Sequence, residues 1–178
     1  YRRPFSAPGN MLHVKGMLFC GHPGVGKSCS LDVLLSFNLH DKPEMTNVVI
    51  AVEGVHIFLN LGGKSQNRYF IKSVPVPLFD HETLLKYGMV RGEPVLLLHD
   101  VKTASSLRYQ SRIVGNLRDT FDLTAIVAAC PQESNYKDFD KDFAGEVVKF
   151  YMPTLTRQET ISLLTTTTTG VLTTQDSL

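Results

Sequence analysis

The stretch of this chain best equipped for chemistry is a glycine-rich loop. Residues 21–28 read Gly-His-Pro-Gly-Val-Gly-Lys-Ser and fill every fixed position of the pattern G-x-x-x-x-G-K-[ST]. Glycines let such a loop fold into a concave nest whose backbone N–H groups point at phosphates, and the N-terminus of the following helix adds partial positive charge. Lys27 would reach the β- and γ-phosphates, and the Ser28 hydroxyl would hold Mg²⁺. The pattern predicts a site for a nucleoside triphosphate.

The residues expected to line the phosphates belong to the loop and to the first turn of the helix after it. They are Gly21, His22, Pro23, Gly24, Val25, Gly26, Lys27, Ser28 and Cys29. Lys27 and the backbone amides of residues 24–28 are expected to hold the phosphates. We expect His22 and Pro23 to shape the loop and to carry no chemistry of their own.

A carboxylate at the end of an apolar run supplies the second part of the expected site. Residues 94–100 read Pro-Val-Leu-Leu-Leu-His-Asp, as in a buried strand that delivers a carboxylate, here Asp100, to Mg²⁺. The alternative is a carboxylate that caps a helix or a turn. The next residue is Val101, where many ATPases carry a glutamate that activates the attacking water. Turnover is therefore expected to be slow, or the base must come from elsewhere, and Glu53 is the best internal substitute.

Other polar residues near these segments have weaker claims. After the apolar run 123–130, a polar side chain that senses the γ-phosphate could be Gln132, Ser134 or Asn135, and Asn135 is favoured. A packed strand histidine is the better interpretation of His99 than a contact to the γ-phosphate or to water. Arg112 and Arg118 could serve a neighbouring subunit as an arginine finger, although exposed helix arginines are the commoner case.

Apolar runs that alternate with helical patterns indicate an α/β fold with helices on both faces of a parallel sheet. Two more runs, 55–61 and 68–74, flank a glycine-containing tip and predict a β-hairpin insertion. We expect a three-layer P-loop NTPase of the ASCE type with a mainly parallel five-stranded sheet. Another strand should lie between those that bear Lys27 and Asp100. The five expected strands are 17–20, 47–53, 94–100, 123–130 and 146–152.

The helices and the larger divisions follow from capping and breaker residues. A helix with an acidic start is expected over 80–86 and another over 108–117, with Arg118 just past its end. Residues 132–142 are expected to form a polar loop or a short helix. The predicted divisions are an N-terminal arm at 1–15, an ATPase core at 16–153, and the start of a helical lid or linker, cut short here, at 154–178.

Composition bounds the class of protein without choosing a partner. The 178 residues have 43% hydrophobic and 20% charged content and a net charge of +1, which is ordinary for a globular domain and gives no global attraction to nucleic acid or membrane. No apolar stretch approaches the roughly 20 residues that span a bilayer. The three cysteines fit neither a disulfide framework nor a zinc site, so we expect buried free thiols in a reducing compartment.

Two other nucleotide-binding classes fit the sequence less well. A GTPase would carry Asp-x-x-Gly after the strand of Asp100 and an Asn-Lys-x-Asp motif, and residues 135–138 read Asn-Tyr-Lys-Asp instead. A small-molecule kinase shares the loop but usually needs an arginine-rich lid, and the only cations in 132–145 are Lys137 and Lys141. A kinase therefore remains the less favoured option.

Together these residues resemble the ATPase domain shared by kinetoplastid retrotransposon hot spot proteins and Crinkler-type effectors. The loop at 21–28 is similar to their Gly-x-Pro-Gly-x-Gly-Lys-Ser, and the likeness extends through 47–74, the Leu-Leu-Leu-His-Asp-Val run at 96–101, and the Cys130–Tyr136 turn. It ends with the Pro153–Glu159 passage, where Thr156 and Glu159 match a capping box. Members commonly have a non-acidic residue after the aspartate, as here, but carry a serine where this chain has Cys130. The wider relatives are AAA+ and STAND-type ATPases.

This resemblance implies an ATPase module within a larger multidomain protein that is nuclear or otherwise intracellular. The expected function is ATP binding and Mg²⁺-dependent hydrolysis to ADP and phosphate, with ATP and Mg²⁺ as ligands. The alternative is a nucleotide-gated interaction or oligomerisation module that hardly hydrolyses ATP. A homo-oligomer, other domains of the same protein and nucleic acid phosphates remain open as partners, and no membrane contact is expected.

Overall fold

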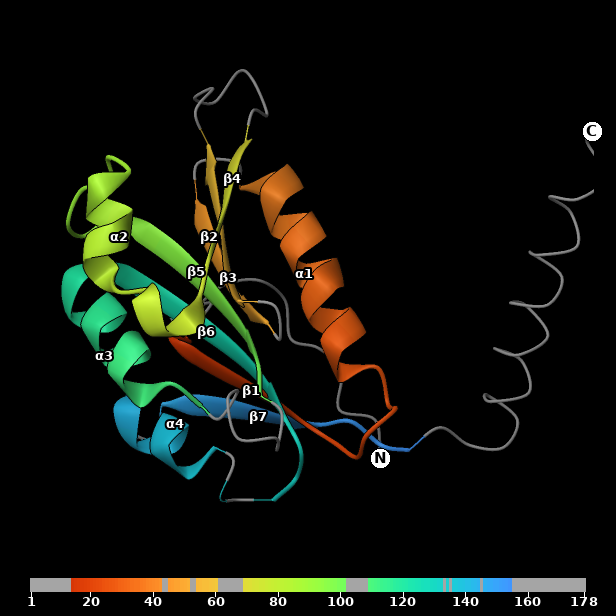
Figure 1. Ribbon diagram of the computed structural model, residues 1–178. Coiled ribbons are helices and arrows are strands. Elements are labelled where there is room, and N and C mark those ends of the chain that lie inside the picture. The colour runs from red at the N-terminus through yellow and green to blue at the C-terminus, as the bar shows by residue number, and fades with distance from the viewer. Residues whose placement is uncertain are drawn as a thin grey trace, which may run out of the picture.

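The computed structural model of this chain describes residues 14–42, 45–51, 54–60, 69–101, 109–132, 134, 136–144 and 146–154. Within these ranges, seven strands form one mixed sheet in the order β4-β3-β2-β5-β6-β1-β7 (Figure 1). The strands are β1 (Gly16–Cys20), β2 (Thr46–Ala51), β3 (Gly54–Asn60), β4 (Tyr69–Val74), β5 (Pro94–Asp100), β6 (Asp122–Ala129) and β7 (Val147–Tyr151).

Five of these strands run parallel and correspond to the five expected from the sequence. β6 pairs with both β1 and β5, which confirms the expected intervening strand. The expected hairpin is present as the antiparallel pair β3 and β4. It extends the same sheet by antiparallel pairing from β2, so the sheet in the described part of the chain has seven strands and not the expected five. The connection from Ala51 to Gly54 is too short for a crossover, so β3 has to return beside β2. The expected strand 47–53 accordingly ends at Ala51.

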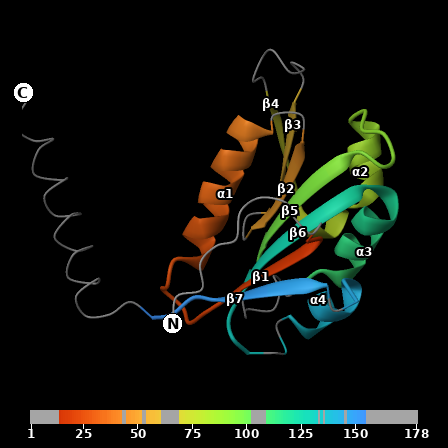
Figure 2. The same cartoon turned by 180° about the vertical axis from the view of Figure 1, so that it is seen from behind.

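Helices cover the two faces of the sheet unequally. Among the helices in the described ranges, the long helix α1 (Lys27–Asp41) lies on one face, whereas α2 (His81–Lys86), α3 (Ser111–Thr120) and α4 (Lys137–Asp142) lie on the other (Figures 1 and 2). Side chains of β5 alternate between these layers: Leu96 and Leu98 pack under α1, and Val95 and Leu97 pack in the larger core on the other face. The same alternation directs Asp100 toward α1 and His99 away from it.

The ends of the helices show where local signals were sufficient. Asp80 caps α2 in a reciprocal capping box with Thr83, so the helix expected over 80–86 begins at His81. The helix expected over 108–117 runs instead from Ser111 to Thr120, and Arg118 therefore lies inside its last turn. The later end follows the buried face, since Leu117 and Thr120 are both buried. The short helix considered possible in 132–142 is α4.

None of the helices in the described ranges is both long and apolar enough to cross a lipid bilayer.

Candidate functional site

The loop that matches the phosphate-binding pattern connects the end of β1 to the start of α1. Gly24 and Gly26 have φ values of +84° and +88°, in the left-handed region that favours glycine. A Cβ built on either residue would meet no atom within 4 Å. Backbone conformation, and not crowding, is therefore the reason for glycine at these two positions, and the space beside them is open.

Gly21 is required for the opposite reason. A Cβ there would lie 2.8 Å from Val25 Cγ2 and 3.0 Å from the carbonyl oxygen of Met152. Met152 follows β7 directly, and its N–H donates a 2.7 Å hydrogen bond to the Cys20 carbonyl. The first glycine of the loop thus allows a close approach between the loop and the end of β7.

Lys27, the first residue of α1, folds its side chain back into the loop. Its Nζ donates hydrogen bonds of 2.7 Å to the carbonyls of Gly21 and His22, and the residue is only 9% exposed. Both partners are neutral, and within the described ranges no carboxylate lies within ion-pair distance of this ammonium. A buried ammonium group whose partners are all neutral is well suited to bind an anionic ligand.

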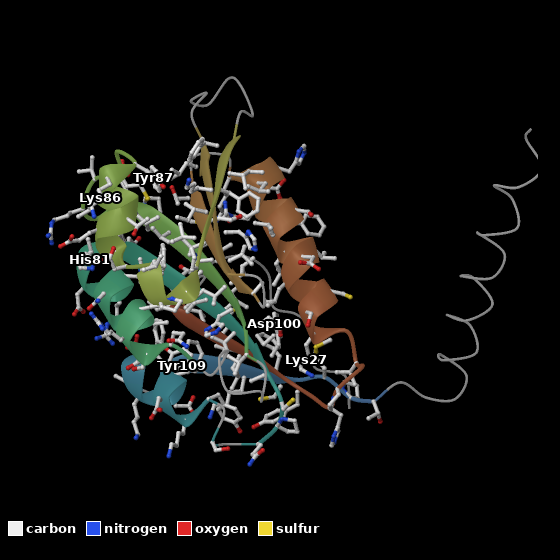
Figure 3. The ribbon with its side chains drawn as sticks, viewed as in Figure 1. Lys27, His81, Lys86, Tyr87, Asp100 and Tyr109 are labelled. Carbon is white, nitrogen blue, oxygen red and sulfur yellow. The ribbon has the colours of Figure 1, made fainter. Side chains whose placement is uncertain are left out.

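Ser28 and Asp100 come together although 72 positions separate them. Ser28 Oγ donates a 2.8 Å hydrogen bond to Asp100 Oδ2, at the point where β5 ends beneath the start of α1. Figure 3 shows Asp100 and Lys27 near each other at this end of the sheet. The sequence placed this serine and this aspartate at one metal site, and the fold brings them into direct contact.

The Ser28–Asp100 pair suits Mg²⁺ better than a softer metal. Both donors are oxygen atoms, which hard cations prefer, and Mg²⁺ is usually held by one or two protein carboxylates together with phosphates and water. In the described part of the chain no group of three or more His, Cys, Asp or Glu side chains could hold a metal on its own. Ser28 and Asp100 fit a Mg²⁺ ion whose other ligands would be phosphate and water.

The side chain at the position after Asp100 packs in the core on the opposite face of the sheet from α1. Val101 is 4% exposed, packs in the core on the α3–α4 side, and donates its N–H to the Ala128 carbonyl. Glu53, the expected substitute base, and Asn135, the expected γ-phosphate sensor, both lie outside the described residues. The other two sensor candidates, Gln132 and Ser134, are exposed.

His99 is a packed strand histidine, as the sequence favoured. It is fully buried on the sheet face opposite the loop, and its ring stacks on that of Tyr109 with centroids 5.9 Å apart. Burial lowers the pKa of His99 to about 4, although the neighbouring Asp100 charge opposes the shift. Neither ring nitrogen has a hydrogen-bond partner in the structure described here. This neutral imidazole is too deep to meet a ligand in the loop.

The expectation of three buried thiols was only partly right. All three cysteines are free, but Cys29 is exposed on α1 and Cys130 is half-buried, so only Cys20 is buried. Burial raises the pKa of the Cys20 thiol. Arg112 and Arg118 are both exposed on α3, and Arg118 donates to the backbone carbonyl of Asp142.

A polar cluster behind β5 was not anticipated from the sequence. Asp142 accepts hydrogen bonds from the Tyr109 and Ser111 hydroxyls. Asp142 lies more than 30 positions from both of these residues, and the three follow no motif. The only local hint was an aromatic residue and a serine just before a helix.

Comparisons with protein-family models, with curated proteins and with solved structures found no match to this chain. The geometry defines an α/β domain in which a glycine-rich loop, a buried lysine and a serine–aspartate pair converge at one end of a mixed sheet. Function must therefore be argued from that geometry.

Proposed function

We propose that this domain is a P-loop ATPase module that binds ATP with Mg²⁺ and hydrolyses it slowly to ADP and phosphate. The observation that carries the proposal is the 2.8 Å hydrogen bond from Ser28 to Asp100, directly beside the buried Lys27. This hydrogen bond brings together a serine at the start of a helix and an aspartate at the end of a strand. Their meeting beside a glycine-rich loop is what a phosphate-bound metal requires.

Each residue has a distinct part in the proposed reaction. Loop amides and Lys27 would bind the β- and γ-phosphates, and Lys27 would exchange its carbonyl partners for phosphate oxygens. Ser28 and Asp100 would hold Mg²⁺, which neutralises charge on the phosphate oxygens when bound. In hydrolysis a water oxygen bonds to the γ-phosphorus, the bond to the β,γ-bridging oxygen breaks, and the water gives up a proton.

A second candidate function is a nucleotide-gated interaction module with little turnover. The observation that favours it is Val101, whose side chain is buried in the core at the position where a glutamate would take that proton. The two functions share the same binding residues and differ only in the rate of the chemical step. A kinase would need an acceptor site, for which we have no candidate residues.

Single-turnover hydrolysis of ATP with Mg²⁺ tests the proposal and separates the two functions. We expect the wild type to bind ATP and Lys27→Ala to lose both ATP binding and hydrolysis. Asp100→Asn should lose the part of ATP binding and hydrolysis that depends on Mg²⁺. Lys86→Ala is the matched control, because this exposed lysine lies on α2, away from the loop (Figure 3). Tight binding without phosphate release would establish the gated module, and equal ATP affinity in Lys27→Ala and Lys86→Ala would refute both functions.

A further inference from the structure

The polar cluster centred on Asp142 lies behind β5, on the opposite side of the sheet from the loop. Asp142 ends α4, and its carboxylate accepts hydrogen bonds from Tyr109 Oη at 2.8 Å and from Ser111 Oγ at 2.7 and 2.9 Å. Its backbone carbonyl accepts a further bond from Arg118. One residue therefore ties the start of α3 to the end of α4 and fixes the chain at Tyr109.

Tyr109 connects this cluster to β5. Its ring stacks on that of His99 at an interplanar angle of 26° and meets the Phe139 ring edge-on at 5.4 Å. Burial together with the hydrogen bond and charge of Asp142 raises the pKa of Tyr109 far above its ordinary value, so its hydroxyl stays a donor at every physiological pH. The tyrosine ring is thus anchored at its hydroxyl end and pressed against the strand by its face.

His99 lies between Tyr109 and the candidate metal site, because its ring contacts Tyr109 and its backbone precedes Asp100. It precedes Asp100 on β5, and the two side chains project to opposite faces of the sheet. Because neither nitrogen of the His99 ring has a hydrogen-bond partner in the described structure, packing alone keeps the ring in place. Loss of the tyrosine ring would open a cavity behind the last two residues of the strand.

We propose that Tyr109, anchored by Asp142, is a positioning residue for Asp100 in Mg²⁺ binding. This inference rests on the proposed function. Mg²⁺ demands near-ideal octahedral geometry at about 2.1 Å, so a small displacement of one carboxylate weakens its binding. In the proposed function the loop and Lys27 would hold the phosphates, and they belong to other segments of the chain than Asp100. A loosened β5 end therefore affects the metal before it affects the nucleotide.

The test compares ATP affinity in Mg²⁺ with ATP affinity in EDTA, measured by titration of a fluorescent ATP analogue. We expect Tyr109→Phe, which keeps the ring but loses the hydroxyl, to raise the Mg²⁺ concentration for half-saturation about threefold. Tyr109→Leu, which also loses the ring, should raise it about tenfold or more. Neither variant should change the affinity in EDTA.

Ser111→Ala is the matched control, because it removes a hydroxyl from the same carboxylate without touching His99. It should lower thermal stability about as much as Tyr109→Phe and leave the Mg²⁺ dependence unchanged. Equal Mg²⁺ dependence in Tyr109→Phe, Ser111→Ala and the wild type would overturn the positioning role alone. A wild type that binds no ATP in either buffer would overturn the proposed function and this inference with it.

Discussion

Ser28 Oγ and Asp100 Oδ2 lie 2.8 Å apart, joined by a hydrogen bond between the first turn of α1 and the last residue of β5. The contact brings together two segments that the strand order keeps apart, since β6 lies between β1 and β5. The contact is possible because α1, which begins after the glycine-rich loop, packs on the face formed by β5 and β6 (Figure 1). In the proposed function, Ser28 and Asp100 would both serve as oxygen ligands of Mg²⁺.

Asp100→Asn tests the metal role with little change in shape. The amide oxygen can still accept the Ser28 hydrogen bond, so we expect the free energy of unfolding to change by less than about 1 kcal/mol. The lost negative charge should weaken Mg²⁺-dependent ATP binding about tenfold or more. Isothermal titration of ATP with and without Mg²⁺ measures both effects. An unchanged Mg²⁺ dependence would remove Asp100 from the site.

Gly26→Ala separates loop conformation from general stability. At φ +88° an alanine should cost about 1–2 kcal/mol of unfolding free energy, as it should in Gly88→Ala at φ +92°. Neither new methyl group meets an atom within 4 Å, so the cost in each variant comes from the backbone conformation. Because the two φ values are similar, the two costs should be similar. Only Gly26→Ala should also weaken ATP binding. Similar ATP affinity in the two variants would mean that the loop conformation is not needed for the ligand.

The stability of this domain should fall as acid protonates His99. The pKa of His99 is about 4 when folded and 6.5 as the reference for an unfolded chain, so between these values the unfolded state binds more protons. The contribution of the neutral ring is complete above pH 6.5 and is lost as the pH falls toward 4, by roughly 3 kcal/mol. Urea unfolding of the wild type and of His99→Leu, each from pH 7 to pH 4, measures the contribution of His99 to the free energy of unfolding. Parallel pH curves for the two proteins would disprove it.

His99→Leu also has a consequence at neutral pH. Leucine fills a similar volume and removes two buried nitrogens that have no partner in the described structure. We therefore expect the free energy of unfolding at pH 7 to rise by about 1 kcal/mol or more. A marked loss of stability would show that the imidazole has a partner that matters to the fold.

Val101→Glu should not create the missing base. The side chain at this position is buried in the core on the α3–α4 side, so a carboxylate there should cost roughly 3 kcal/mol or more and leave turnover no faster. Val90→Glu is the control, since Val90 is 62% exposed and tolerates a charge. Urea denaturation and single-turnover hydrolysis check the pair. Faster turnover in a stable Val101→Glu protein would show that this residue can reach the nucleotide.

Local pattern predicted much of the fold. Apolar runs in the sequence predict the five parallel strands, and the spacing of the glycines predicts the loop between β1 and α1. The membership of β3 and β4 in the same sheet was missed, because a hairpin pattern does not say which strand its edge will pair with. The length of the Ala51–Gly54 connection was the overlooked clue.

The candidate site was predicted only where a motif encodes it. The loop, Lys27, Ser28 and Asp100 each carry a fixed spacing or a strand-end position, and the structure brings Ser28 and Asp100 into contact. Tyr109 and Asp142 meet only through the packing of α3 on α4, and no periodicity records such a contact. The hydrogen bond between Tyr109 and Asp142 could therefore be found only from the three-dimensional structure.

The close contact between Gly21 and Met152 has a mechanical consequence. β7 ends at Tyr151, three positions before Thr154. The next residue, Met152, donates its N–H to the Cys20 carbonyl and lies against the loop at Gly21. A pulling force applied at residue 154 would therefore act along β7 and shear it against its parallel neighbour β1. The same force would distort the loop before it distorted any of the described helices. We expect an optical-tweezers experiment pulling at this end to find a higher rupture force with ATP bound, because ligand contacts would brace the loop at the point of attachment.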